Sequence, residues 1–170
     1  MPNPRNKQFV EHVLKLPSFD YVREIKNLLT QHGDTIDLLV ATIDQKLLVR
    51  EEACRIWSEV IGFAYVDPFA SVITEEAIGK LPIEVAKKTK ALGLYLLGDA
   101  LTVAMANPDD ADLVRRLSQI AQLPISPVFS LPREIEDAIA VYYSTDRSLE
   151  ESLSELERST IFDQPDLASD

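Results

Sequence analysis

The sequence predicts an α+β protein, with an all-helical N-terminal lobe followed by a small lobe of about three to four strands packed with helices. Two observations predict this class. Before Gly62, apolar residues recur at helical spacing. After it, apolar runs and helical stretches follow in the order helix, strand, turn, strand, helix, strand, helix. We therefore expect lobes at residues 1–61 and 62–144, and an acidic linker or tail at 145–170.

The first lobe is predicted to contain four helices, because four stretches carry apolar residues three and four positions apart. Pro17 ends the first helix, since proline has no N–H to continue it. Ser18 is expected to cap the second helix, and Gly33 to follow its end. The predicted helices are residues 5–16, the stretch from Ser18 to Gly33, residues 34–44 and residues 50–61.

The second lobe alternates between strand and helix signals. In order, the predicted elements are a β-prone run at 63–66, a short helix near Ala77, a helix at 81–90, strands at 92–97 and 101–106, a helix at 109–122, a strand at 125–129 and a helix from Pro132. The strands on either side of the Gly98-Asp99 turn are apolar on both faces, so helices should cover both faces of the sheet. Pro127 cannot donate a ladder hydrogen bond, which places its strand at an edge.

Charge is concentrated at the C-terminus. Residues 145–170 hold eight acidic side chains and two arginines, and so supply six of the eleven net negative charges. We expect this tail to be disordered, although residues 148–159 could extend as a polar helix through Leu149, Leu153 and Leu156. The rest of the chain is only mildly acidic, which argues against nucleic acid or an anionic membrane as the main partner.

Composition also bears on the cellular compartment. No apolar run approaches the ~20 residues that a membrane helix needs. The N-terminus lacks the apolar core of a signal peptide. Cys54 is the single cysteine, so no internal disulfide can form. These features favour a cytoplasmic protein without direct membrane insertion.

No catalytic motif is found, and the chain is expected not to be an enzyme. The sequence contains no GxxxxGK[ST] phosphate loop, and its five glycines are too scattered to cradle a phosphate. His12 and His32 lack the spacing of metal ligands, so they favour ordinary surface positions. Cys54 lies on an apolar helix face, which favours a buried, inert thiol over a nucleophile. We expect no catalytic residue, no metal and no cofactor.

Two charged clusters have structural as well as functional interpretations. Asp109, Asp110 and Asp112 could suggest a cation site, but their position favours capping the N-terminus of the following helix. Lys87, Lys88 and Lys90 could dock an anion or an acidic partner. A solvated helix face is the simpler interpretation of these lysines.

Several phrases of the second lobe resemble a known family in order and spacing. They are Gly62–Asp67, Leu81–Ala86, Gly98-Asp99, Leu101–Pro108, Pro127-Val128 and Glu134–Tyr143. Together they resemble the N-terminal domain of the bacterial type II secretion and type IV pilus assembly ATPases, the general secretory pathway protein E N-terminal domain family. The first lobe is less similar to that family.

The resemblance implies a non-catalytic accessory domain. In this family, such a domain docks on the cytoplasmic part of an inner-membrane platform protein. It is linked in cis to a C-terminal hexameric ATPase, which supplies most hexamer contacts. The resemblance therefore implies a chain that is monomeric in isolation, located in the cytoplasm and peripheral to the inner membrane through its partners.

One branch of the family binds cyclic di-GMP through tandem motifs of the type Arg-Leu-Gly-x-x-Leu-x-Gly. This sequence contains no Arg-Leu-Gly, and Gly33 is the only glycine before Gly62. The alternative function is therefore a cyclic di-GMP sensor with a degenerate motif. It would need arginines such as Arg23 and Arg50 to converge on a groove.

The docking surface is expected on the first lobe, because a lobe that diverges within a fold usually carries the partner-specific contacts. An apolar stripe from the first two helices is the candidate. Its members are Phe9, Val13, Val22, Ile25 and Leu29. The alternative is that these residues form the lobe's own core.

Overall fold

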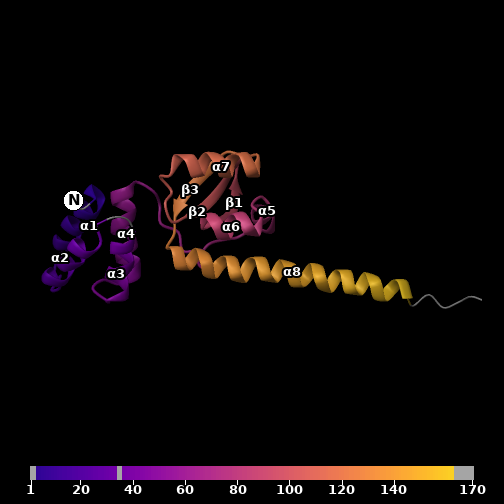
Figure 1. Ribbon diagram of the computed structural model, residues 1–170, viewed down its shortest axis with the longest axis horizontal. Coiled ribbons are helices and arrows are strands. Elements are labelled where there is room, and N and C mark those ends of the chain that lie inside the picture. Colours follow the sequence, from indigo (N-terminus) through magenta and orange to yellow (C-terminus); the bar gives the residue numbers. More distant parts are fainter. Residues whose placement is uncertain (1–2, 34–35, 163–170) are drawn as a thin grey trace, which may run out of the picture.

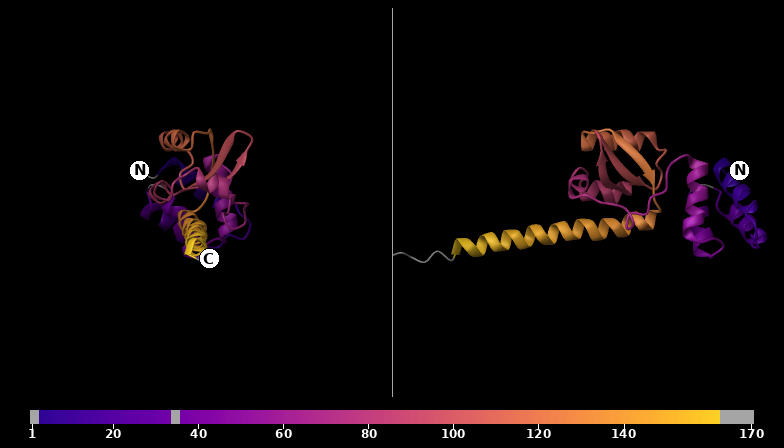
Figure 2. Two further views of the ribbon diagram at one scale, coloured as in Figure 1. Left: turned by 90° about the vertical axis from the view of Figure 1, so that its right-hand side faces the viewer. Right: turned by 180° about the vertical axis from the view of Figure 1, so that it is seen from behind.

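The computed structural model describes residues 3–33 and 36–162. In these ranges it contains eight helices and one three-stranded sheet, which confirms the predicted α+β class. Four helices form the N-terminal lobe, and the sheet with its covering helices forms the second lobe beside it (Figure 1). The last helix runs along the second lobe and projects beyond it, as the view from behind also shows (Figure 2).

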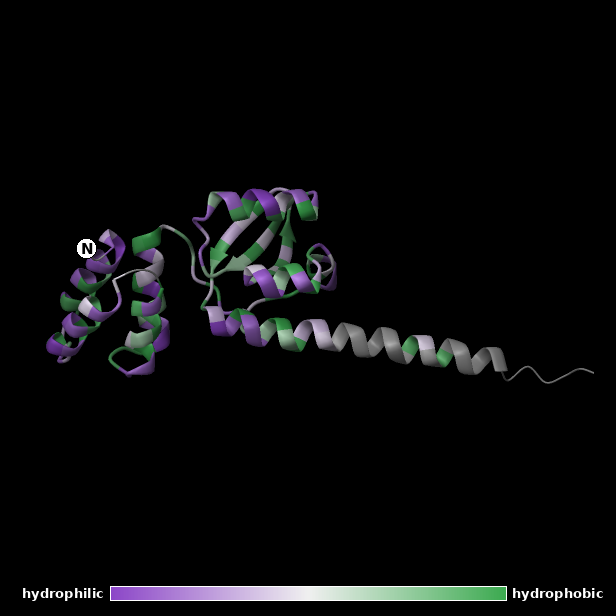
Figure 3. Cartoon of the chain, in the orientation of Figure 1, coloured by the Kyte–Doolittle hydropathy of each residue, from purple (hydrophilic) through white to green (hydrophobic). Residues whose placement is uncertain are grey.

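The N-terminal lobe is built from amphipathic helices. These are α1 (Pro4–Leu14), α2 (Val22–Gln31), α3 (Asp37–Asp44) and α4 (Arg50–Ile61). Hydrophobic and hydrophilic residues alternate along each of them (Figure 3). The apolar faces meet in one core, in which Phe9 packs edge-on against Trp57 with ring centroids 5.6 Å apart.

The second helix starts later than the sequence suggested. Ser18 has a φ of 68°, in the left-handed region, whereas an N-cap residue normally has extended φ and ψ. The chain therefore turns at Ser18, and α2 begins at Val22 without a side-chain cap. The predicted Ser18 cap is wrong for this reason. The start predicted for the third helix, at Asp34, lies outside the described residues.

The sheet has the order β1-β2-β3. β1 (Ala91–Leu97) and β2 (Ala100–Met105) form an antiparallel hairpin. Its turn has Gly98 at a φ of 60°, a conformation that glycine adopts readily. β3 (Ile125–Phe129) pairs in parallel with β2 after a crossover through α7 (Ala111–Ala121). The edge position predicted from Pro127 is confirmed.

Helices cover both faces of the sheet. α7 covers one face, where Leu117 packs against Val103 and Met105. On the opposite face lie α6 (Ile83–Thr89) and α8 (Pro132–Phe162). β1 and β2 are buried between these layers over most of their length, as their apolar composition predicted.

The short helix α5 (Glu75–Gly79) packs closely against β1. The strand register shifts between Gly93 and Tyr95, and Gly93 faces the backbone of α5 at this irregularity. A Cβ atom on Gly93 would lie 2.6 Å from the carbonyl oxygen of Ala77. The close contact between α5 and the sheet therefore depends on glycine at this position.

The expected boundary between residues 144 and 145 does not coincide with a helix end. α8 continues to Phe162. Residues 145–162, which we expected to belong to a disordered tail, are therefore helical. The physical reason is that no proline or glycine interrupts the stretch from 133 to 162. The alternative prediction of a helix at 148–159 falls within α8, and residues 163–170 lie outside the described part.

Candidate docking site at the lobe junction

The two lobes share a hydrophobic core at their junction. Phe129 and Leu131, which follow one another closely at the end of β3, pack into the core of the N-terminal lobe. Gly62 ends α4 with a φ of 77°, and the segment after it runs beside Phe129. The Val66 N–H donates to the Phe129 carbonyl, and the Phe129 N–H donates to the Ala64 carbonyl, both at 2.8 Å. The N-terminal lobe is therefore fixed to the sheet.

A polar cluster, which we call the junction cluster, lies beside this core. It consists of Arg50, Tyr65, Asp67 and Glu134. The Arg50 guanidinium contacts Glu134 at 3.0 Å and Asp67 at 3.3 Å. The Tyr65 hydroxyl donates to the Glu134 carboxylate at 2.9 Å. The cluster joins α4, the connecting segment and α8 through side chains that are distant in sequence.

Glu134 also closes the first turn of α8. One of its carboxylate oxygens accepts a hydrogen bond from the Leu131 N–H at 3.4 Å. This is one half of a capping box, in which the third helical residue reaches back to the N–H of the residue before the helix. The same side chain thus caps α8 and connects it to α4.

Burial governs the titration of the cluster. Burial raises the pKa of Glu134. This increase exceeds the lowering of the same pKa by the hydrogen bond from Tyr65 and by the charge of Arg50. Burial also raises the pKa of the Tyr65 hydroxyl. The pKa of Arg50 is raised chiefly by its hydrogen bond to Glu51. Arg50 remains charged and forms ion pairs with carboxylates of its own chain.

Cys54 lies close to the cluster but has no nucleophilic character. Its side chain is fully buried, and burial raises the pKa of its thiol to about 12. The thiolate required for attack is therefore not formed near neutral pH. The predicted inert thiol agrees with this environment.

The acidic residues before α7 have separate structural roles. Asp110 caps the helix, since its Oδ1 accepts from the Leu113 N–H at 3.0 Å. Asp109 forms an ion pair with Arg5 of α1, a second link between the lobes. Asp112 pairs with Arg115 one turn later. Within residues 3–33 and 36–162, no group of His, Cys, Asp or Glu side chains is arranged to hold a metal ion.

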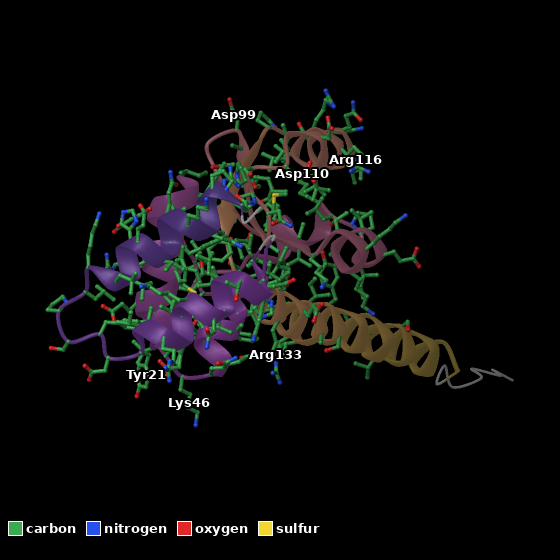
Figure 4. All side chains as sticks on the ribbon, turned by 60° about the vertical axis from the view of Figure 1, so that its left-hand side comes forward. Tyr21, Lys46, Asp99, Asp110, Arg116 and Arg133 are labelled. Atoms are coloured by element: carbon green, nitrogen blue, oxygen red, sulfur yellow. The ribbon has the colours of Figure 1, made fainter. Side chains whose placement is uncertain are left out.

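A cleft of about 760 Å³ opens between α3 and the start of α8, and we call it the α3–α8 cleft. Its apolar lining includes residues of α3 together with residues at the start of α8. These residues are Ile36, Val40, Ile43, Ala106, Leu131 and Pro132. Arg133 marks the α8 side of the cleft, where that helix meets the N-terminal lobe (Figure 4).

Acidic side chains dominate the rim of the α3–α8 cleft. Lys90 at the rim pairs with Glu136 at 2.9 Å, and Arg50 is held in the junction cluster. Asp37, Asp44 and Asp137 are exposed, and no ion pair neutralises them among the described residues. Among the described residues, Arg133 is the one remaining cation of the lining. The rim therefore carries a net negative charge.

The two arginines that a nucleotide site would need are differently placed. Arg23 is exposed on α2, whereas Arg50 lines the α3–α8 cleft at the start of α4. Among the described residues, neither the α3–α8 cleft nor two further cavities are lined by both arginines. Arg50 also donates hydrogen bonds to Glu51, Asp67 and Glu134, so a nucleotide would compete with three carboxylates for its guanidinium.

The apolar stripe proposed for partner binding lies mostly inside the lobe. Phe9, Val13 and Ile25 are completely buried, and Leu29 is half-buried against the same core. Only Val22 is exposed, at 41% of its surface. Three of the five residues thus occupy the core, as the alternative interpretation stated, and a partner cannot contact them in this arrangement.

Sequence analysis did not identify the importance of Glu134. It occurs in the phrase that resembles the secretion ATPases, and it lies two residues after Pro132 at a helix start. Those signals indicate a cap. Its pairing with Arg50, 84 residues away, required the three-dimensional structure.

The comparisons with known proteins identify the family. The MshEN domain family matches residues 61–149, which is 89 of the 170 residues. The chain belongs to the MshEN domain family. The matched range of this MshEN domain includes three residues of the junction cluster, Tyr65, Asp67 and Glu134.

Solved structures share the fold at low sequence identity. One, described as MshE with cdg, has a TM-score of 0.61 and 19% identity, and the match covers 83% of this chain and 99% of that chain. The N-terminal domain of XpsE has a TM-score of 0.52 and 20% identity, with 82% of this chain and 96% of that chain covered. No curated protein matches the chain.

Together, the family and the shared fold confirm the resemblance found in the sequence. This MshEN chain is an N-terminal domain of the type found in type II secretion and type IV pilus ATPases. In those ATPases the N-terminal domain is separate from the catalytic domain. None of the helices described for this chain combines the length and apolarity that crossing a membrane requires.

Proposed function

We propose that this chain is a non-catalytic docking and regulatory domain of a type II secretion or type IV pilus assembly ATPase. It binds the cytoplasmic part of an inner-membrane platform protein and is linked in cis to a C-terminal hexameric ATPase. It acts in the cytoplasm, peripheral to the inner membrane through these partners. The observation that carries the proposal is membership of the MshEN family by a chain without a phosphate loop.

The lobe junction supports a docking role. A docking domain can pass the position of its bound partner on to the rest of the protein only if its two lobes keep a fixed arrangement. Phe129 and Leu131 provide an apolar connection between the lobes, and Arg50 and Glu134 provide a polar one. The open α3–α8 cleft lies directly beside these connections.

A cyclic di-GMP sensor is the second candidate function. The observation in its favour is the shared fold with MshE, whose structure is described with cdg. Two features argue against it here: the lack of Arg-Leu-Gly, and hydrogen bonds from Arg50 to three carboxylates of its own chain. Unneutralised carboxylates at the rim of the cleft would also repel a phosphodiester.

Calorimetric titration separates the two functions. The purified chain is titrated in parallel with cyclic di-GMP and with the cytoplasmic domain of the platform protein encoded with it. We expect heat of binding with the platform domain and none with the nucleotide. Binding of the nucleotide alone would replace the docking function with the sensor function. Silence with both would reject both.

A further inference from the structure

We propose that the α3–α8 cleft is a docking groove for an amphipathic helix that carries lysine or arginine on both sides of its apolar face. This inference rests on the proposed docking function and specifies the chemistry of the partner. It is carried by the shape of the cleft, its apolar lining and the charge of its rim.

The lining of the cleft suits an apolar helix face. Val40 and Ile43 of α3 are half-buried, and Leu131 and Pro132 contribute from the start of α8. Two elements thus border one apolar strip, as in grooves that receive amphipathic helices. Leu131 is only 8% exposed, so an occupant would rest on a surface anchored in the hydrophobic core.

The charge of the rim selects a cationic partner. Asp44 lies at the end of α3, on one side of the cleft, and Asp137 lies on α8, on the other. With Asp37 they form three exposed carboxylates, and within the described part of the chain the only uncompensated cation of the lining is Arg133. Basic residues on both flanks of a bound helix would meet these carboxylates, and such complementarity contributes specificity and association rate.

The same charge disfavours other occupants. The C-terminal stretch of this chain, residues 145–170, carries eight acidic side chains and two arginines, so the rim would repel it. An anionic small molecule faces the same carboxylates, and Arg50 cannot offset them while it is bound to Glu134 and Asp67.

A synthetic peptide of about five helical turns tests the inference. It carries leucine on one face and lysine on both flanks, and a twin carries glutamate in place of lysine. Fluorescence anisotropy measures the binding of each peptide to the full chain. The cleft variant is Asp44→Lys with Asp137→Lys. The matched control is Glu76→Lys with Asp99→Lys, which changes the net charge equally on exposed residues outside the lining (Figure 4 places Asp99 on the side of the molecule opposite to Arg133).

We expect the lysine peptide to bind the wild-type chain and the control, and the cleft variant to bind it about tenfold more weakly. The glutamate twin should not bind. Trp57 fluorescence verifies that the variants are folded. If the double variant is unfolded, the single variant Asp137→Asn replaces it, with a smaller expected loss of affinity for the lysine peptide. Equal weakening in the control, no weakening in the cleft variant, or binding of the glutamate twin would each overturn the inference.

The platform domain distinguishes failure of the inference from failure of the proposed function. If it binds the wild-type chain and the cleft variant equally, docking stands and the cleft is not the docking site. If it does not bind the wild-type chain, the docking function is rejected. The peptide measurement then decides separately whether the groove selects basic helices.

Discussion

At the scale of single residues, Gly93 decides how closely α5 can approach the sheet. Replacing it with alanine would place a Cβ atom 2.6 Å from the Ala77 carbonyl oxygen, which belongs to the backbone and cannot rotate away. We expect Gly93→Ala to lower the free energy of unfolding by about 1–3 kcal/mol, the usual effect of overpacking. Urea denaturation measures the change.

Gly79 provides the matched control for this substitution. It lies in helix α5, and apart from its chain neighbours and the backbone of its own helix no heavy atom lies within 4 Å of the position that its Cβ would occupy. Gly79→Ala should leave stability unchanged or raise it by up to about 1 kcal/mol, because alanine favours the helix. Equal changes in the free energy of unfolding at both positions would show that the close contact with Ala77 does not explain the cost of replacing Gly93.

Glu134 makes stability depend on pH, because burial raises its pKa in the folded chain. Between the unfolded and folded pKa values, the folded chain holds a proton that the unfolded chain has released. The contribution of Glu134 to the free energy of unfolding is therefore complete below its unfolded pKa of about 4.3 and falls as pH rises through the folded pKa.

Comparison with Glu134→Gln isolates this effect. Urea denaturation is carried out on both proteins between about pH 4 and pH 7. The stability of the wild type relative to the variant should decrease as pH rises. Glu51 has a lowered pKa and acts in the opposite direction, but it is present in both proteins and cancels in the comparison. A constant difference would contradict the expected contribution of Glu134.

Cys54 offers a simple measure of whether the junction opens. Its thiol is completely buried and has a pKa raised to about 12, so a thiol reagent should not modify the folded chain. We expect one thiol per chain to react only after denaturation. Rapid modification of the native protein at neutral pH would show that the core around α4 opens without global unfolding.

At the scale of elements, α8 has two parts with different roles. Its first part is buried, since Ile139 is only 2% exposed and the Tyr143 hydroxyl donates to the Leu81 carbonyl at 2.7 Å. A chain truncated after Ser144 should keep its free energy of unfolding within about 0.5 kcal/mol, because it retains these contacts. Truncation after Ala138 removes Ile139 and Tyr143, and should cost at least about 2–5 kcal/mol.

Circular dichroism and urea denaturation test both truncations. The first should lose helical signal without losing stability, and the second should lose both. If truncation after Ser144 destabilises the chain as strongly as the shorter one, the distal part of α8 contributes to folding, and the division of the helix into two parts is wrong.

Elements also show what a single sequence can predict. Pro127 and the Gly98-Asp99 turn were informative because each restricts the backbone locally, so the edge strand and the hairpin followed directly. Ser18 was misleading because its residue type suits a cap but its backbone forms a turn. An apolar helix face also does not reveal what covers it, which is why Phe9 was proposed for a partner and lies in the core.

At the scale of the whole molecule, the shared core predicts cooperative unfolding. Phe129 belongs to the sheet of the second lobe and is completely buried with the core of the first. We expect Phe129→Ala to cost about 3–5 kcal/mol. In the wild type, fluorescence of Trp57 in the first lobe and circular dichroism of the whole chain should report one coincident transition.

Leu97→Ala is a suitable control, because Leu97 is 72% exposed at the end of β1 and its removal should cost about 0.5 kcal/mol or less. Two separated transitions in the wild-type chain would contradict the cooperativity expected from the junction. They would indicate that residues 1–61 and 62–144, the lobes that we propose, unfold independently.

The continuous course of α8 has a mechanical consequence. From Ser144 to Phe162 the helix extends by about 27 Å at 1.5 Å per residue. Its first part is held by the second lobe from Glu134 to Tyr143, beside the proposed groove, so the distal part would act as a lever arm. A tilt of about 10° at Ser144 displaces Phe162 by about 5 Å. A small change of direction where the helix leaves the second lobe would thus be magnified at its far end.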